Sequence, residues 1–413
     1  MLSGRKEKML IESQSGWVNK TDIFLSERAF PFGIFLLLTG LFWLGDHGLY
    51  SKLFYWSLLL PTLLSILLFP GNVRNLLASR ICVAYLPFAC YMASTVFWST
   101  SDDGLFEMMK RPLFVLLFFY PVFELGRRRF DLLCAAVKWG AVLAVVAAVW
   151  TLGEFLFSVD QYRLTGYGAL YNPLLTSHVF GFFLAWWLGL YFSERRLFDP
   201  VALSSMLILL GLVLATGSRT PLVAMFAVVI WLSVATRNRK GILTLCSLLT
   251  GCILVWLFAP EILTQRGLSH RTEIWMDVLR QISEKPWFGH GFNSPLWVRL
   301  EALSYPLQDP HNLTLAVFFI GGAVGGILWL VLYATALLES WRWRNDKWVL
   351  VFSATLIYGL MAGMTEGGSF LSRPKEHWFL VWIPLALMSA AVYQACIRSR
   401  MDTTNQGTTG ANG

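Results

Sequence analysis

The chain is organised around long apolar segments separated by short polar connections, and this pattern restricts its fold more than any other feature. A helix that crosses the hydrocarbon core of a bilayer needs about 20 mostly apolar residues. Twelve such segments can be placed in the sequence, at 29–44, 50–70, 81–98, 112–125, 132–157, 168–193, 199–215, 221–236, 241–260, 311–339, 347–364 and 376–397. The pattern predicts an all-α polytopic membrane protein with twelve transmembrane helices.

Composition excludes the soluble alternatives. Hydrophobic residues make up 56% of the 413 positions and charged residues 14%, whereas soluble globular chains carry about 25% charged residues. The net charge of +8 lies in small groups between apolar segments, which is typical of membrane orientation and not of a nucleic-acid-binding face. The six cysteines form no CxxC pair, so no disulfide framework or cysteine metal site is indicated.

The distribution of Lys and Arg predicts the orientation. With a cytoplasmic N-terminus, inside segments carry 20 Lys and Arg residues and the short outside loops carry 7, as the positive-inside rule requires. The resulting division is a cytoplasmic segment 1–28, nine helices within 29–260, an outer loop 261–310, three helices within 311–397 and a cytoplasmic tail 398–413. We find no internal repeat, which disfavours a secondary transporter.

The outer loop 261–310 is far longer than the other connections, and loops of that length are usually functional or disordered. Its apolar residues are spaced as one face of a helix, and they are Ile274, Trp275, Val278, Leu279 and Ile282. Pro286 is expected to end this amphipathic helix, which we interpret as a lid or a binding element. The low-complexity segment 403–413 is expected to be disordered.

Several predicted helices have a proline near their outer end, beside a charged residue. These are Arg111-Pro112, Arg219-Thr220-Pro221, Asp309-Pro310-His311 and Arg373-Pro374. Proline suits the first helical position, a helix N-terminus attracts anions, and an arginine fork matches phosphate oxygens. We expect an anion at Arg219 and at Arg271, which begins the amphipathic helix. For Arg111 and Arg373 we favour anchoring of helix ends.

His311 is the candidate catalytic residue. If Asp309 caps the tenth helix and Pro310 begins it, His311 lies in the first turn. The positive end of the helix then disfavours the imidazolium and leaves a neutral ring that accepts a proton. Asp309 orienting the imidazole, and a purely structural His311, are the alternatives. Arg163, in a polar turn leading into the sixth segment, stays open between a structural and a binding role, and His178 within that segment is expected to face a polar cavity.

Motifs for other chemistries are missing from the sequence. The outer carboxylates form no DxD cluster, and Asp102-Asp103 is their one adjacent pair, which is weak support for a metal site. There is no P-loop, Gly-rich dinucleotide turn or GxSxG. We therefore expect no metal, no cofactor and no nucleotide substrate.

The ordered motifs resemble the O-antigen ligase family. They are Arg163…Gly166…Asn172-Pro173, Ser218-Arg219-Thr220, Arg271-Thr-Glu-Ile-Trp275, Pro286-Trp-Phe-Gly289-His-Gly291, and His311-Asn312 before Gly321-Gly322. With the number of helices and the place of the long loop, the resemblance covers most of the chain. Each motif alone is weak, whereas the ordered set is fairly specific to the superfamily of O-antigen ligases and polymerases.

The resemblance implies a GT-C-type glycosyltransferase in the inner membrane of a Gram-negative bacterium, with both termini cytoplasmic. Such an enzyme transfers O-antigen from undecaprenyl diphosphate to lipid A–core oligosaccharide on the periplasmic face, without a metal and with inversion. Arg219 and Arg271 would hold the diphosphate, and His311 would bind or deprotonate the acceptor hydroxyl. The expected substrate-binding residues are Arg163, Asn172, His178, Asp309 and Asn312.

Three alternatives remain at this level. A polysaccharide polymerase uses the same donor with a lipid-linked acceptor, and a pilin O-oligosaccharyltransferase uses a protein acceptor. A lipid-linked oligosaccharide transporter would carry charged residues deep within its spans, where this chain offers few ionisable side chains, chiefly Glu154 and His178.

The charge asymmetry makes a topological prediction. Reporter fusions after Arg129, Arg239 and Arg344 should give cytoplasmic signals, and fusions within 285–305 should give periplasmic signals, because Lys and Arg are retained inside. A cytoplasmic signal from 285–305 would contradict a periplasmic active site.

Overall fold

The computed structural model describes residues 20–158, 162–194, 196–258, 270–300 and 305–409. Within these ranges the regular structure is helical, apart from one isolated antiparallel bridge between Val298 and Leu307. The principal helices are α2 (Phe30–Thr39), α3 (His47–Phe54), α4 (Leu60–Leu68), α5 (Arg80–Ser94), α6 (Leu105–Arg128), α7 (Phe130–Phe157), α8 (Pro173–Ser193), α9 (Pro200–Ala215), α10 (Thr220–Thr236), α11 (Arg239–Phe258), α13 (Arg271–Glu284), α14 (Leu313–Arg342), α15 (Lys347–Gly363) and α16 (Trp382–Thr409).

Each of the twelve predicted apolar segments coincides with a helix or a continuous run of helices. Eight of these, among the described residues, are long and apolar enough to cross a membrane by length and composition. Three more, α9, α10 and α15, are apolar but shorter, and α6 carries several charged residues near its ends. The structure therefore agrees with a polytopic membrane protein, while the number of twelve spans stays a prediction.

Two predicted helix starts are wrong. The fourth helix begins at Leu105 and not near 112, so Pro112 lies inside α6 and does not begin it. The tenth helix begins at Leu313, with Asn312 as its N-cap. By contrast, Pro221 does lie in the first turn of α10. At the C-terminus, α16 continues through Thr409, across much of the segment for which composition predicts disorder.

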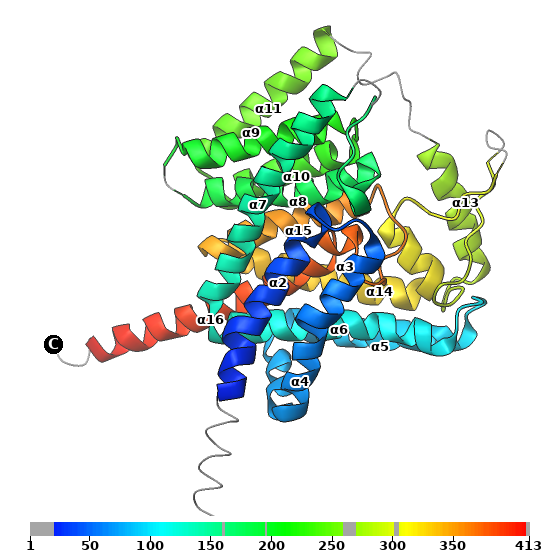
Figure 1. Ribbon diagram of the computed structural model, residues 1–413, viewed down its shortest axis with the longest axis horizontal. Helices are drawn as coiled ribbons and strands as arrows, with labels where there is room; N and C mark the ends of the chain where they lie inside the picture. The colour runs from blue at the N-terminus through cyan, green and yellow to red at the C-terminus, as the bar shows by residue number, and fades with distance from the viewer. Residues whose placement is uncertain (1–19, 159–161, 195, 259–269, 301–304, 410–413) are drawn as a thin grey trace, which may run out of the picture.

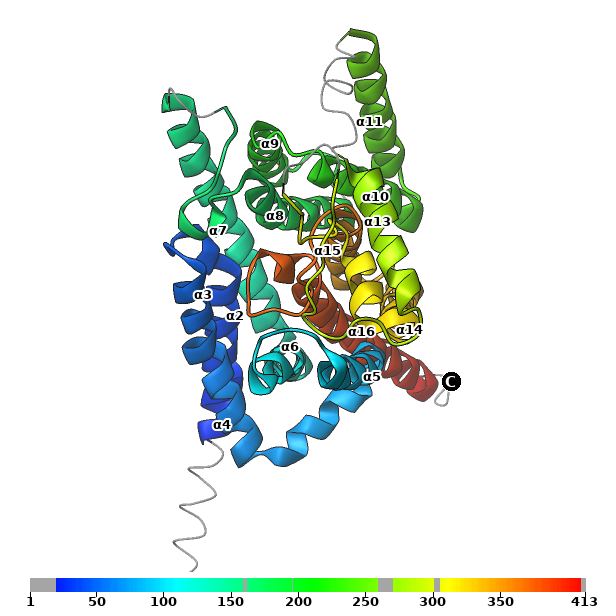
Figure 2. The ribbon, with the colours of Figure 1, turned by 90° about the vertical axis from the view of Figure 1, so that its right-hand side faces the viewer.

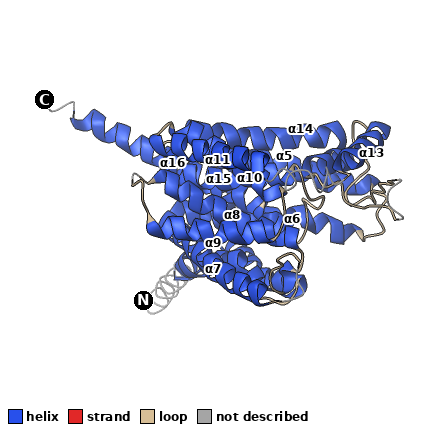
Figure 3. Cartoon of the chain, turned by 90° about the horizontal axis from the view of Figure 1, so that it is seen from above, coloured by secondary structure: helices blue, strands red, loops and turns tan. Residues whose placement is uncertain are grey.

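Helices α8 and α15 pack against each other at the centre of the bundle, with α9, α10 and α16 around them (Figures 1 and 2). Trp186, Trp378 and Trp382 are among the largest fully buried side chains. The view in Figure 3 shows many of the loops gathered at one end, beside α13, whereas α16 ends at the opposite side of the molecule. Of the predicted catalytic residues, Arg219 and His311 lie in connections just before helices, and Arg271 is the first residue of α13.

The amphipathic helix of the outer loop is confirmed as α13, which packs against α14. Ile274 and Val278, on one face of α13, are buried in the same hydrophobic cluster as Phe319 of α14. Leu279 is 47% exposed, so it is not part of this buried face. This packing fixes Arg271, the first residue of α13, relative to the N-terminal half of α14.

Helix α14 is broken at Gly322, whose φ of 58° and ψ of −157° are not helical. The segment Pro286–Gly291 supplies the hydrogen bonds that the break removes. The amides of His290 and Gly291 donate to the carbonyls of Phe319 and Ile320 at 2.8 and 2.9 Å, and the amides of Ala323 and Val324 donate to Pro286 and Trp287 at 2.7 and 3.2 Å. Two sequence motifs, the Pro286–Gly291 turn and the Gly321-Gly322 pair, thus form one structural unit.

We predict that Gly322→Ala destabilises the protein, because a Cβ at this position would lie 2.5 Å from the backbone of Trp287 and the φ is positive. Backbone strain of this kind costs about 1–3 kcal/mol. Thermal unfolding of the purified protein in detergent, followed by tryptophan fluorescence, should show a lowered Tm. Gly211→Ala in α9 is the matched control, since a Cβ there meets nothing within 4 Å. Equal melting of Gly322→Ala and wild type would show that the break does not depend on glycine.

Candidate active site

The carboxylate of Glu366 joins two of the three residues predicted to be catalytic. Its Oε1 lies 2.6 Å from Nδ1 of His311, and its Oε2 accepts a hydrogen bond of 3.0 Å from Nη2 of Arg271. The side chain of Glu366 is only 8% exposed. Glu366 follows the end of α15, His311 precedes α14, and Arg271 begins α13, so residues from three separate parts of the sequence meet at one buried carboxylate.

The turn that presents His311 differs from the prediction. His311 lies outside the helix with a φ of 48°, and its amide donates to Oδ1 of Asp309 at 2.7 Å. Asn312 is the residue that caps α14, by accepting from the amide of Leu315 at 3.0 Å. Asn and Asp are equally good N-caps, and the left-handed residue His311 separates Pro310 from the helix. Asp309 therefore shapes the turn and does not cap the helix.

The electrostatics of His311 also differ from the prediction. The hydrogen bond with Glu366 raises the pKa of His311, and the negative charges of Glu366 and Asp309 act in the same direction, against partial burial. Burial opposes ionisation of Glu366, but His311 and the charge of Arg271 lower its pKa overall. Burial raises the pKa of Asp309. The prediction of a depressed pKa for His311 is wrong, because the ring faces a carboxylate and lies outside the first turn.

Arg219 is placed near this group by α10. It is the N-cap residue of α10, and the next residue, Thr220, accepts a hydrogen bond of 3.3 Å from Nη2 of Arg271. The guanidinium of Arg163 donates to the carbonyl of Thr216 at 2.7 Å and to Oγ of Ser218 at 3.1 Å. Arg163 thereby braces the turn that presents Arg219, a supporting role for a residue that the sequence left open.

Two predicted substrate-binding residues, Asn172 and His178, form no hydrogen bond with the Glu366 carboxylate in the described part of the chain. Asn172 is exposed and caps α8 by accepting from the amide of Leu174 at 2.8 Å. His178 is fully buried in α8, where neither ring nitrogen has a hydrogen-bond partner among the described residues. Its ring centroid lies 6.2 Å from that of His377. Among the described residues neither side chain forms a hydrogen bond or ion pair with His311, Glu366 or Arg271, although the charge of His178 contributes to lowering the pKa of Glu366. Their substrate roles stay predictions.

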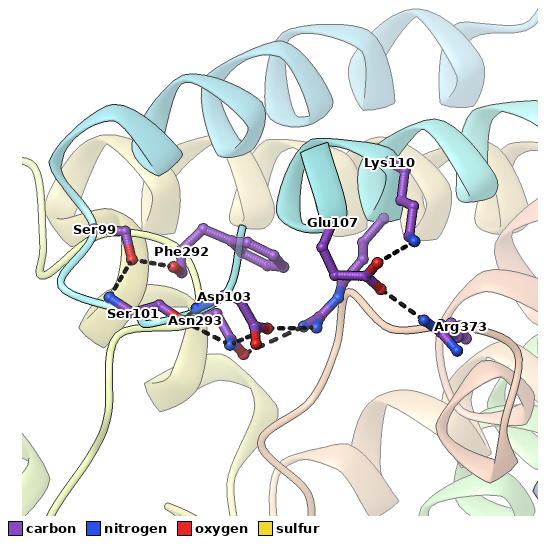
Figure 4. Close-up of polar contacts among 9 residues, drawn as sticks. Ser99, Ser101, Asp103, Glu107, Lys110, Phe292, Asn293 and Arg373 are labelled. Atoms are coloured by element: carbon purple, nitrogen blue, oxygen red, sulfur yellow. Dashed lines mark hydrogen bonds and ion pairs between the residues drawn. The ribbon is translucent and has the colours of Figure 1, made fainter. Parts of the chain in front are cut away.

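A cavity of about 820 Å³ opens beside Asp309 and Pro310. Arg111, Arg373 and Lys375 line it, although anchoring of helix ends was the favoured role for the two arginines. Arg111 pairs with Asp103 at 2.9 Å, and Arg373 pairs with Glu107 at 2.7 Å, as Figure 4 shows for Arg373. Hence the two arginines form part of a polar wall that leads to the turn carrying His311.

The described residues contain no group of three or more His, Cys, Asp or Glu side chains that could hold a metal ion. Asp103, of the adjacent pair Asp102-Asp103, is engaged by Arg111 and by Nδ2 of Asn293 at 2.9 Å. The side chains gathered here include two arginines that can bind an anion and an imidazole that can exchange a proton.

Comparison with known proteins agrees with the motifs. The family model described as O-antigen ligase matches residues 204–330. An O-antigen ligase of Pseudomonas aeruginosa is 44% identical over 387 residues, which cover 94% of this chain and 95% of the relative. The chain belongs to the O-antigen ligase family. The resemblance seen in the motifs is thus confirmed, and membership of the O-antigen ligase family places the chain in lipopolysaccharide biosynthesis.

The part of the chain matched by the O-antigen ligase model includes Arg219, Arg271 and His311 but ends before Glu366. Glu366 is the candidate site residue that the motifs missed. In the sequence it is one of several scattered outer-side carboxylates, and its position in a Thr-Glu-Gly-Gly turn at the end of an apolar segment is the only local signal.

The contact with Glu366 predicts that Glu366→Gln lowers the pKa of His311 toward its ordinary value, because the carboxylate that favours the imidazolium is removed. NMR titration of the ¹⁵N-histidine-labelled protein in nanodiscs measures this shift. Glu273→Gln is the control, because Glu273 is exposed on α13 and contacts His270. An unchanged His311 pKa in Glu366→Gln would mean that Glu366 does not set its protonation.

Proposed function

We propose that this O-antigen ligase transfers O-antigen polysaccharide from undecaprenyl diphosphate to a sugar hydroxyl of lipid A–core oligosaccharide, on the periplasmic face of the inner membrane. The observation that carries the proposal is the contact of one buried carboxylate, Glu366, with both His311 and Arg271. A proton acceptor and an anion-binding guanidinium are thereby fixed next to each other, as a glycosyl transfer from a diphosphate requires.

In this proposal Arg271 and Arg219 bind the donor diphosphate. A guanidinium donates two parallel hydrogen bonds to phosphate oxygens, and the N-terminus of α10 beside Arg219 adds backbone amides that favour an anion. The charge that develops on the diphosphate as the glycosidic C–O bond breaks is stabilised by the same groups. Preorganised donors of this kind often make the largest single contribution to catalysis.

His311 acts on the acceptor. Nδ1 of His311 faces Glu366, which leaves Nε2 to take the proton of the acceptor hydroxyl. The acceptor oxygen attacks the anomeric carbon as the bond from that carbon to the phosphate oxygen breaks, and undecaprenyl diphosphate leaves. Attack opposite the leaving group inverts the anomeric carbon. Glu366 orients the ring and stabilises the imidazolium, as the carboxylate does in a Ser-His-Asp triad.

Polymerases and pilin O-oligosaccharyltransferases share this donor chemistry. We favour the ligase because the Pseudomonas aeruginosa relative, matched over nearly its whole length, is named an O-antigen ligase. The acceptor is the difference among the three activities, and a gel of the lipopolysaccharide reports it directly.

Deletion of the gene should remove the whole O-antigen ladder from lipopolysaccharide gels while lipid-linked polymer accumulates. Expression of wild type should restore the ladder. Arg271→Ala should leave it absent at normal protein levels, and Arg271→Lys should restore only part, because an ammonium does not match two phosphate oxygens in one plane. A single-repeat band on deletion would identify a polymerase, and full activity of Arg271→Ala would remove this arginine from the site.

The raised pKa of His311 makes a prediction for pH dependence. A base must be unprotonated, so transfer by the purified enzyme should fall as the pH drops through the His311 pKa, which lies above the ordinary 6.5. His311→Ala should lose about 10²–10⁴-fold in rate, and excess EDTA should have no effect. Near-normal turnover of His311→Gln would mean that the ring only positions the hydroxyl. Inhibition by EDTA that is reversed by magnesium or manganese would show that a metal takes part.

A further inference from the structure

The cavity beside Asp309 has a cationic wall that the proposed chemistry does not use. Its volume of about 820 Å³ lies within the usual range for small-molecule sites. Arg111, Arg373 and Lys375 line it, whereas Arg219, Arg271, His311 and Glu366 do not. Asp309 belongs both to the cavity lining and to the turn of His311, since its Oδ1 accepts from the His311 amide. The cavity therefore reaches the turn that carries His311, and its lining contains neither of the two proposed diphosphate ligands.

The carboxylates next to Lys375 are directed toward other groups. Glu376 contacts Nε2 of His47, and Asp309 accepts from the amide of His311. Further along the wall, Glu107 is engaged by Arg373 and Lys110 (Figure 4). Among the described residues the side-chain ammonium of Lys375 has no hydrogen bond or ion pair, and only its backbone carbonyl accepts one, from the amide of Trp378. It differs in this respect from Arg111 and Arg373, which are both paired.

Lys375 is also partly removed from water. Burial lowers its pKa, and the positive charge of Arg111 acts in the same direction, while Glu376 and Asp309 oppose the shift. A partly buried ammonium without a hydrogen-bond acceptor is unfavourable, so the cavity is complementary to a negatively charged group. The exposed ring of Tyr171 on the same lining supplies an apolar surface beside it.

We propose that Lys375 binds an anionic group, a phosphate or a carboxylate, of the acceptor oligosaccharide, with Arg111 and Arg373 on the same wall. This inference rests on the proposed ligase function and assigns the cavity to the acceptor. The donor diphosphate is the other source of phosphate, and we assign it to Arg219 and Arg271, which lie outside the cavity lining. An acceptor held at Lys375 would place a neighbouring hydroxyl against the Asp309–His311 turn.

The test is a binding measurement that needs no turnover. The full-length protein in nanodiscs is titrated with three probes: lipid A–core oligosaccharide, the same material freed of phosphate esters by hydrofluoric acid, and undecaprenyl diphosphate. A hydrogen bond to a charged group supports about a tenfold change in affinity or more. Lys375→Met should therefore weaken binding of the intact acceptor about tenfold and leave binding of undecaprenyl diphosphate unchanged. Lys375→Arg, which keeps the charge, should recover most of the affinity.

Lys285→Met is the matched control, because Lys285 is an exposed lysine at the end of α13 and does not line the cavity. Equal affinity of wild type and Lys375→Met for the intact acceptor would overturn the proposal. A loss of affinity for undecaprenyl diphosphate, with unchanged affinity for the intact acceptor, would also overturn the proposal, because it would assign the cavity to the donor. If Lys375→Met weakens binding of the phosphate-free acceptor equally and Lys375→Arg restores it, the anion is a carboxylate. The same loss without recovery in Lys375→Arg would contradict the proposal. Activity of His311→Ala would contradict the catalytic scheme alone, since binding at Lys375 is read separately.

Discussion

The buried carboxylate of Glu366 is the interaction on which the site depends. An ionised group with so little exposure is costly unless its charge and its oxygens are satisfied. Here one oxygen is used by His311 and the other by Arg271. Removing either partner would leave the carboxylate incompletely paired, so the three side chains stabilise one another. The ends of α13, α14 and α15 are drawn together at this point, although the two contacts span 55 and 95 residues of sequence.

Much of the fold can be predicted from the sequence because the bilayer imposes a simple length rule. The apolar segments coincide with helices, and the spacing of Ile274 and Val278 locates α13 and its buried face. The residues at which helices begin are harder to predict. Asp309-Pro310 and Asn312 both offer favourable start signals, and a sequence does not reveal that His311 takes a left-handed conformation between them. The direction of the His311 pKa shift was also not predictable from the local sequence, because this pKa is set by a carboxylate distant in the sequence and not by the local helix.

The candidate site was only partly predictable for a related reason. Arg219, Arg271 and His311 occur in recognisable motifs, whereas Glu366 has no motif and acquires its role only through contacts made in the folded chain. The same holds for Arg111, Arg373 and Lys375, because their predicted positions at helix ends did not indicate that they line a common cavity. Isolated charged residues at a membrane interface have an ordinary anchoring role, and only their spatial grouping distinguishes a site from a set of anchors.

The break in α14 has a mechanical consequence. Because the Pro286–Gly291 turn is bonded through its backbone on both sides of Gly322, the N-terminal part of α14 is tied to α13 and carries the His311 turn with it. Arg219 instead directly precedes α10, and Glu366 follows the end of α15. The proposed catalytic groups are therefore shared between two halves, with Arg271 and His311 on one and Arg219 and Glu366 on the other. Glu366 already bonds to His311 and Arg271 across this division, so a diphosphate held by both arginines would add a second link between groups that the protein itself has joined.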